Sequence, residues 1–310
     1  MRKAEAGKLW KKRFHDSWEF YVFLIIPLAY LFIFVYIPMA GVQIAFRHFT
    51  PRGGIWGSEW VGLRNFIKFF QSYQFRRVLP NTLRLSIYGL AAGFPVPIIF
   101  ALLLNVMNNG KAKKIVQTVT YMPHFISTVV MVGMLIRLCS PVNGLYGHII
   151  RLFNLSNVDI LAKPDFFPHL YVWSGIWQGF GWGSIIYLAA LSGVSSELHE
   201  AAEIDGANRF QRVIHIDFPA ILPTATILLI LEAGGIMGVG FEKAFLMQNE
   251  MNLRTSEIIS TYVYKVGLAS GGFSDFSYST AIGLFNSVVN LILLIIVNAA
   301  ARRISETSLW

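Results

Sequence analysis

The sequence predicts an all-α integral membrane protein with six transmembrane helices and a polar helix-turn-helix between two of them. Apolar residues make up 55% of the 310 residues and charged residues only 14%, whereas about a quarter of a typical soluble chain is charged. A spanning helix needs about 20 predominantly apolar residues, and six segments qualify: 18–46, 82–107, 115–138, 170–194, 220–239 and 279–301. A polar stretch, 195–219, separates the fourth segment from the fifth.

The first span follows a basic tail, 1–17, whose cationic residues are Arg2, Lys3, Lys8, Lys11, Lys12 and Arg13. The apolar run after it is much longer than the 7–15 residues of a signal-peptide core and has no convincing cleavage site. We therefore expect it to be retained. The chain divides into this tail, one six-helix membrane domain, 18–301, and a short C-terminal tail, 302–310.

Six spans place both termini on one side of the membrane. Lys and Arg near the ends of short loops favour the cytoplasm, and the N-terminal tail and later basic residues fall together on that side: Lys111, Lys113, Lys114, Arg302 and Arg303. The formal net charge of +9 therefore reports membrane topology and not a nucleic-acid partner. Longer connections face outward at 47–81, 140–169 and 240–278, and the first carries an amphipathic stretch from Trp60 to Phe70 that is suited to the membrane surface.

The polar stretch 195–219 is predicted to form a cytoplasmic helical hairpin. Ser195 or Ser196 is a suitable cap for a first helix, and acidic residues follow near its positive end. Gly206 is placed to end that helix in a left-handed turn. A second helix is expected over about 208–216, ending before Pro219, because proline disfavours helix in the residue before it. A solvated loop with a surface helix is the alternative.

The same stretch resembles the EAA motif of membrane subunits of ATP-binding-cassette (ABC) importers. The matching positions are Glu200, Ala201, Ala202, Gly206, Ile216, Asp217 and Pro219, with the motif spacing kept throughout and Phe218 standing where leucine is more usual. Asp205, beside Gly206, is predicted to supply a further polar contact to the ATPase. The resemblance implies the fold of type I ABC importer permeases. It also implies that this hairpin is a coupling helix that docks on a separate ATPase subunit.

A wider resemblance covers the chain from the first span onward. Residues 60–66, 81–83, 93–105, 121–126, 240–246 and 283–285 are similar to carbohydrate-importer permeases of the LplB-like branch. The resemblance implies a bacterial cytoplasmic-membrane protein that imports oligosaccharides by alternating access. It implies as partners a second, homologous permease in a heterodimer, an ATPase dimer that binds ATP and Mg, and an extracytoplasmic sugar-binding lipoprotein.

Catalytic and cofactor motifs are missing from the sequence. It has no glycine-rich loop ending in Gly-Lys-Ser or Gly-Lys-Thr, so we expect no ATP hydrolysis by this chain. The seven histidines show no ligand spacing, and no metal or cofactor is assigned. Nothing resembles a nucleophile elbow. The chain is therefore expected not to be an enzyme.

Five residues are candidates for the substrate path. Glu232 lies inside the fifth span, where a charge is costly and marks a cavity or a partner, or else a hydrogen-bonded structural acid. Trp173 and Trp177 share a helix face and would either stack on sugar rings or belong to an interfacial aromatic belt. Phe241 and Glu242 follow a glycine cluster and are placed to close the cavity toward the outside.

Three other functions remain open at this stage. An ABC permease for another solute, such as a peptide or an amino acid, would carry the same hairpin. An ion-gradient-driven secondary carrier predicts buried ionisable residues on several spans, whereas Glu232 stands almost alone. A membrane enzyme or scaffold predicts a cluster of catalytic or ligand residues at one membrane face, which the sequence does not show.

Overall fold

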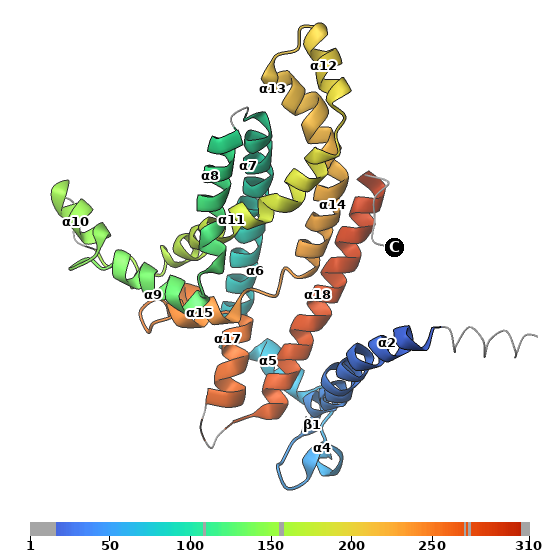
Figure 1. The fold of residues 1–310 in the computed structure, drawn as a ribbon. Helices are drawn as coiled ribbons and strands as arrows, with labels where there is room; N and C mark the ends of the chain where they lie inside the picture. The colour runs from blue at the N-terminus through green and yellow to red at the C-terminus, as the bar shows by residue number, and fades with distance from the viewer. Residues whose placement is uncertain (1–16, 108–109, 155–157, 270, 272–273, 305–310) are drawn as a thin grey trace, which may run out of the picture.

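The computed structural model describes residues 17–107, 110–154, 158–269, 271 and 274–304, and these are almost entirely helical (Figure 1). Residues 1–16 of the basic tail and 305–310 of the C-terminal tail lie outside the described residues. In the described part, two short strands, β1 (Arg47–His48) and β2 (Glu59–Trp60), pair antiparallel, with Arg47 opposite Trp60.

The first helical segment stands apart from the body of the molecule. It comprises α2 (Trp18–Leu31), the π-helical η1 (Phe32–Tyr36), α3 (Ile37–Met39) and the 3₁₀-helical η2 (Ala40–Phe46). Together they form the expected run over 18–46, and none of its most apolar window is buried. In Figure 1 α2 extends to the side, and the segment joins the body where η2 packs against α18 (Phe276–Ile304). An apolar surface of this length is suited to lipid or to another membrane helix.

The remaining long helices form the body. α6 (Tyr73–Gly93) and α7 (Pro95–Val106) make one 34-residue segment that starts nine residues before the expected boundary at residue 82. α11 (Phe167–Ser192) packs against both α6 and α7, while α14 (Phe218–Gly234) packs against α18. Asn290 of α18 supports the second pairing by accepting a hydrogen bond from the backbone N–H of Met237 at 2.9 Å.

The expected span over 115–138 is bent in the structure. The chain forms α8 (Gly110–Tyr121) and η3 (Met122–Phe125), then turns by 100° into α9 (Thr128–Leu138). Pro123 lies in η3, and the hydroxyl of Ser127 accepts a hydrogen bond from the N–H of Val130, which starts a new helix. Both signals were present in the sequence.

The count of six spans is not confirmed. In the described residues, four helices are long and apolar enough to cross a membrane, or five if the bent pair of α8 and α9 forms one span. α11 has the length, with 26 residues. Its glycine and polar positions, among them Gln178, keep its composition less apolar than that of the other spans.

Short helices lie away from the hairpin, some of them at the opposite end of the molecule (Figure 1). They are α4 (Gly54–Gly57), α5 (Arg64–Gln71), α10 (Leu145–Leu152), α15 (Phe241–Met247), α16 (Leu253–Ser256), α17 (Ile259–Tyr264) and η5 (Lys265–Ala269). α5 lies where the amphipathic stretch was predicted. Its Phe69 is fully buried and packs edge-on against Phe75 and Phe285.

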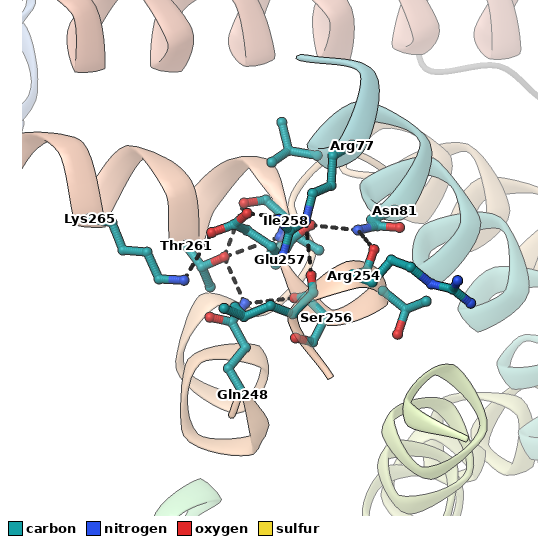
Figure 2. Close-up of polar contacts among 12 residues, drawn as sticks. Arg77, Asn81, Gln248, Arg254, Ser256, Glu257, Ile258, Thr261 and Lys265 are labelled. Atoms are coloured by element: carbon teal, nitrogen blue, oxygen red, sulfur yellow. Dashed lines mark hydrogen bonds and ion pairs between the residues drawn. The ribbon is translucent and has the colours of Figure 1, made fainter. Parts of the chain in front are cut away.

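A polar cluster ties α15, α16 and α17 to α6 (Figure 2). The buried carboxylate of Glu257 lies 3.4 Å from Arg77 and 2.9 Å from Lys265. The amide of Asn81 donates to the backbone carbonyls of Arg254 and Glu257, each at 2.9 Å. Because these contacts join segments about 175 residues apart in sequence, they fix the position of the segment that follows α14.

Candidate functional site

The polar stretch forms a helical hairpin at one end of the molecule, beyond α14 (Figure 1). Its helices are α12 (Ser196–Ile204) and α13 (Arg209–Arg212). The Ser195 hydroxyl caps α12 by accepting from the N–H of Glu197 at 3.2 Å, as predicted. Asn208 and Gln211 cap α13 reciprocally, each side chain accepting from the other's backbone N–H, at 2.9 and 2.8 Å. An ion pair of 3.0 Å between Glu203 and Arg212 links the two helices.

Gly206 makes the bend. Its φ of +81° lies in the left-handed region, as the sequence predicted for this glycine. The N–H of Ala207 donates to the carbonyl of Ala202 at 2.8 Å, and the N–H of Gly206 donates to that of Glu203 at 3.1 Å. These two bonds form a Schellman motif, which satisfies carbonyls at the end of α12 and fixes the angle between the helices.

The prediction that the second helix ends before Pro219 is wrong. α13 continues through the π-helical η4 (Val213–Asp217) into α14, so that one helical segment of 26 residues runs from Arg209 to Gly234. Phe218 keeps helical angles, φ −64° and ψ −47°, although a proline follows it. Pro219 directly follows the π-helical turn and lies in the first turn of α14, and the helix continues through it.

Four of the predicted coupling residues surround a hollow of about 270 Å³ between the two limbs of the hairpin: Ala202, Asp205, Gly206 and Ile216. Glu200 and Ala201 lie exposed on α12 outside this hollow. Two apolar side chains that were not predicted as site residues protrude from the same helix, Leu198 at 55% exposure and Ile204 at 87%. The hairpin therefore presents an exposed face that is partly apolar and partly acidic.

Asp217 belongs to the stretch that resembles the EAA motif, but the sequence analysis assigned it no role. Its carboxylate is buried and lies 3.3 Å from His199 Nε2 of α12, and it accepts a hydrogen bond of 3.2 Å from the Asn105 amide at the end of α7. Asp217 thus joins both limbs of the hairpin to a second long helix. A charged residue directly before Phe218-Pro219, at the edge of an apolar run, was the available signal.

A second hollow, the central cavity, lies in the body and has a volume of about 500 Å³. Its walls are formed by α6, by α11, by the end of α14 and by the glycine-rich segment that follows α14. Glycines four residues apart form much of these walls: Gly89 and Gly93 on α6, and Gly175, Gly179 and Gly183 on α11. A Cβ at Gly89 or at Gly179 would meet no atom within 4 Å, so the helix backbone is open at these two positions and leaves room for a solute.

Glu232 lines the central cavity. The other four predicted path residues are not among its lining residues. Trp173 is exposed, and its indole N–H donates to the Tyr88 hydroxyl at 2.8 Å. Trp177 is also exposed and, like Trp173, occupies a face of α11 that does not line the cavity. Phe241 stacks on Phe245 with ring centres 5.4 Å apart, and Glu242 is exposed.

Lys243 lines the cavity and was also missed. Its Nζ donates to the backbone carbonyl of Tyr171 at 2.6 Å and lies 4.7 Å from the centre of that residue's ring. Burial lowers the pKa of Lys243 to about 8, because desolvation disfavours the ammonium. α15 is held there by Ala244 and Met247, which belong to a buried apolar cluster with Met131 and Val132. Lys243 lies in the stretch 240–246 that resembles carbohydrate-importer permeases, but that resemblance assigned it no role.

Two relatives are similar to the chain along nearly its whole length. LplB of Bacillus subtilis (strain 168) is 41% identical over 295 residues, covering 95% of this chain and 92% of LplB. The polygalacturonan/rhamnogalacturonan transport system permease protein YteP of the same organism is 42% identical over 290 residues, covering 94% of this chain and 89% of YteP. The expected resemblance to the LplB-like branch is confirmed.

The fold matches solved ABC transporter structures. A chain of a bacterial ABC transporter involved in import of the acidic polysaccharide alginate aligns with a TM-score of 0.87 and 38% identity, covering 96% of this chain and 99% of that one. A chain of the alginate transporter in complex with an alginate pentasaccharide-bound periplasmic protein aligns with a TM-score of 0.88 and 37% identity. The alignment covers 97% of this chain and 100% of that one. Residues 93–306 match the sequence model of the binding-protein-dependent transport system inner membrane component family. The chain belongs to the family of binding-protein-dependent transport system inner membrane components.

Proposed function

We propose that this chain is one permease subunit of an ABC importer that moves oligosaccharides inward across the cytoplasmic membrane by alternating access. Support comes from relatives named for transport of polygalacturonan, rhamnogalacturonan and alginate. A central cavity with glycine walls offers space for sugar rings. Family membership alone would leave peptides and amino acids open as cargo, and the sugar-named relatives favour saccharides.

The observation that carries the mechanism is the continuous helix from Arg209 to Gly234. One end forms the second limb of the hairpin, and the other end brings Glu232 to the central cavity. A force applied to the hairpin would therefore reach the cavity wall through one continuous helical segment. Asp217 provides a second connection to α7, which shares its long segment with α6 of the cavity wall.

The hairpin is the part that receives force from an ATPase. We assign its exposed face, with Glu200, Ala201, Leu198 and Ile204, to contact with a separate ATPase subunit. The small side chains allow close approach, and Asp205 and Gly206 shape the turn. Closure of an ATPase dimer upon ATP and Mg binding would draw two such hairpins together and turn the cavity outward, and hydrolysis would reset it.

The proposed assembly contains a second, homologous permease, two ATPase subunits and an extracytoplasmic sugar-binding lipoprotein. The chain would cross the membrane six times, with the bent pair of α8 and α9 as the third crossing and α11 as the fourth. Both termini and the hairpin would then face the cytoplasm. This arrangement agrees with the basic residues at the N-terminus and after the last span.

Reconstitution tests the function. The chain, its companion permease and the ATPase would be placed in proteoliposomes with the binding protein, and uptake of a labelled oligosaccharide would be followed with and without ATP. We expect uptake that requires both ATP and the binding protein. Uptake that persists with a hydrolysis-deficient ATPase and follows an ion gradient would instead establish a secondary carrier.

A further inference from the structure

Lys243 brings a positive charge into the central cavity. It lies on α15, directly after the glycine-rich segment, and its ammonium reaches the cavity across the face of α11. A Cβ at Gly175 would lie 3.0 Å from Nζ, so the ammonium lies close to the backbone of α11 at a residue without a side chain.

The hydrogen-bonding capacity of this ammonium is only partly used. It has three N–H donors, and the Tyr171 carbonyl accepts one of them at 2.6 Å. The face of the Tyr171 ring, 4.7 Å away, provides a favourable but non-directional contact. The remaining donors are available to a molecule in the cavity.

The charge also lacks a close counter-ion. Among the residues that the structure describes, no carboxylate lies within 4.0 Å of Lys243 Nζ. Glu232 lines the same cavity from α14 but is beyond that distance. A cation withdrawn from water without a paired anion is costly, and the lowered pKa of Lys243, about 8, reflects that cost. An anionic ligand would offset it.

We propose that Lys243 binds the carboxylate of a uronic acid unit, and that the cargo of this permease is an acidic oligosaccharide. This inference rests on the proposed function, according to which the cargo is an oligosaccharide. It adds that the oligosaccharide carries a negative charge. A carboxylate on the ammonium forms a charge-assisted hydrogen bond, which is among the stronger polar contacts in a protein. Glu232, which lines the same cavity, would accept hydrogen bonds from sugar hydroxyls.

The test uses the complete importer in proteoliposomes with two probes of equal length. One is an oligogalacturonate, and the other is the same oligosaccharide with its carboxyl groups reduced to primary alcohols. The binding protein is the same in every experiment, so a change in preference between permease variants arises in the permease. The quantity compared is the ratio of uptake kcat/KM for the acidic probe to that for the reduced probe.

Lys243→Gln is expected to lower this ratio about tenfold or more, mainly through KM of the acidic probe, because a hydrogen bond to a charged group is lost. Uptake of the reduced probe shows that the variant is folded and coupled. Lys243→Arg should retain most of the preference. Lys68→Gln is the matched control, because Lys68 is exposed and paired with Asp275 at 3.0 Å outside the cavity.

The outcomes are distinguishable. ATP-dependent uptake of the probes with a ratio that Lys243→Gln leaves unchanged, or a wild-type preference for the reduced probe, would overturn the role of Lys243 and leave the importer function standing. Absence of ATP-dependent uptake of either probe by the wild-type assembly would contradict the proposed function itself.

Discussion

Replacement of Gly206 tests whether the geometry of the hairpin transmits force. A residue with a Cβ is disfavoured in the left-handed region by roughly 1–2 kcal/mol, and Gly206 has φ +81°. A Cβ at this position would meet no atom within 4 Å. Backbone strain is therefore the whole effect, and a β-branched side chain increases it. Gly206→Val should reduce the population of the native turn by about 5- to 30-fold.

The expected consequence is loss of coupling without loss of the membrane fold. The two Schellman hydrogen bonds weaken, and α12 no longer keeps a fixed angle to the helix that begins at Arg209. In proteoliposomes, the number of oligosaccharide molecules imported per ATP hydrolysed should fall severalfold, while ATP hydrolysis and assembly persist. Gly206→Asn should lose less, because asparagine tolerates the left-handed region better than other residues with side chains.

Gly57→Val provides the matched control. Gly57 is exposed near the opposite end of the molecule, a Cβ there meets nothing within 4 Å, and its φ is not positive. This variant should import with wild-type stoichiometry. A wild-type transport-to-hydrolysis ratio in Gly206→Val would refute the reasoning, because the turn would then not matter for force transmission.

Three further predictions concern other parts of the molecule. Asp217→Ala removes the buried acceptor that joins the hairpin to α7. In the same proteoliposomes, the number of oligosaccharide molecules imported per ATP hydrolysed should fall severalfold in this variant and by less in Asp217→Asn. Wild-type stoichiometry in the alanine variant would remove this residue from the coupling path. Glu257→Ala removes the buried carboxylate that pairs with Arg77 and Lys265 at the opposite end. Because both cations are partly exposed, we expect about 1–3 kcal/mol of destabilisation, seen as a Tm lowered by a few degrees in the purified complex, and an unchanged Tm would contradict this. Preference for an acidic probe should depend on pH through Lys243, whose pKa is about 8. A bound carboxylate raises that pKa, so the preference is fully present below about pH 8 and is lost as the pH rises through the higher value of the complex. Two other titratable residues, Tyr171 and Glu232, also line the cavity. If the preference still depended on pH in Lys243→Gln, the titrating group would be one of these two and not Lys243.

The local parts of the hairpin were predictable from the sequence. A serine followed by acidic residues predicts the start of α12, and a glycine at the correct spacing predicts its left-handed end. Both depend on neighbouring residues only, and the structure has Ser195 and Gly206 in these roles. The continuation of the second limb through Pro219 was not predictable from the general preference against helix before proline, because a π-helical turn accommodates it.

The two residues to which the sequence analysis assigned no role have partners that are distant in sequence. Asp217 meets Asn105 across 112 residues of sequence, and Lys243 meets Tyr171 across 72. Neither pairing follows from helical periodicity or from a short motif. Glu232 was recognised as a candidate because a charge inside an apolar run is unusual by itself, and it does lie in the wall of the central cavity.

Cross-linking from the hairpin tests the central claim most directly, which is that α12 docks on an ATPase made by another chain. Ile204 is 87% exposed on α12, and Cys139 is the single cysteine of the sequence. Ile204→Cys in a Cys139→Ser background should form a short-range cross-link to the ATPase subunit, with a yield that changes when ATP binds. Labelling of that cysteine by a membrane-impermeant thiol reagent added outside intact cells, with no cross-link to the ATPase, would contradict the account.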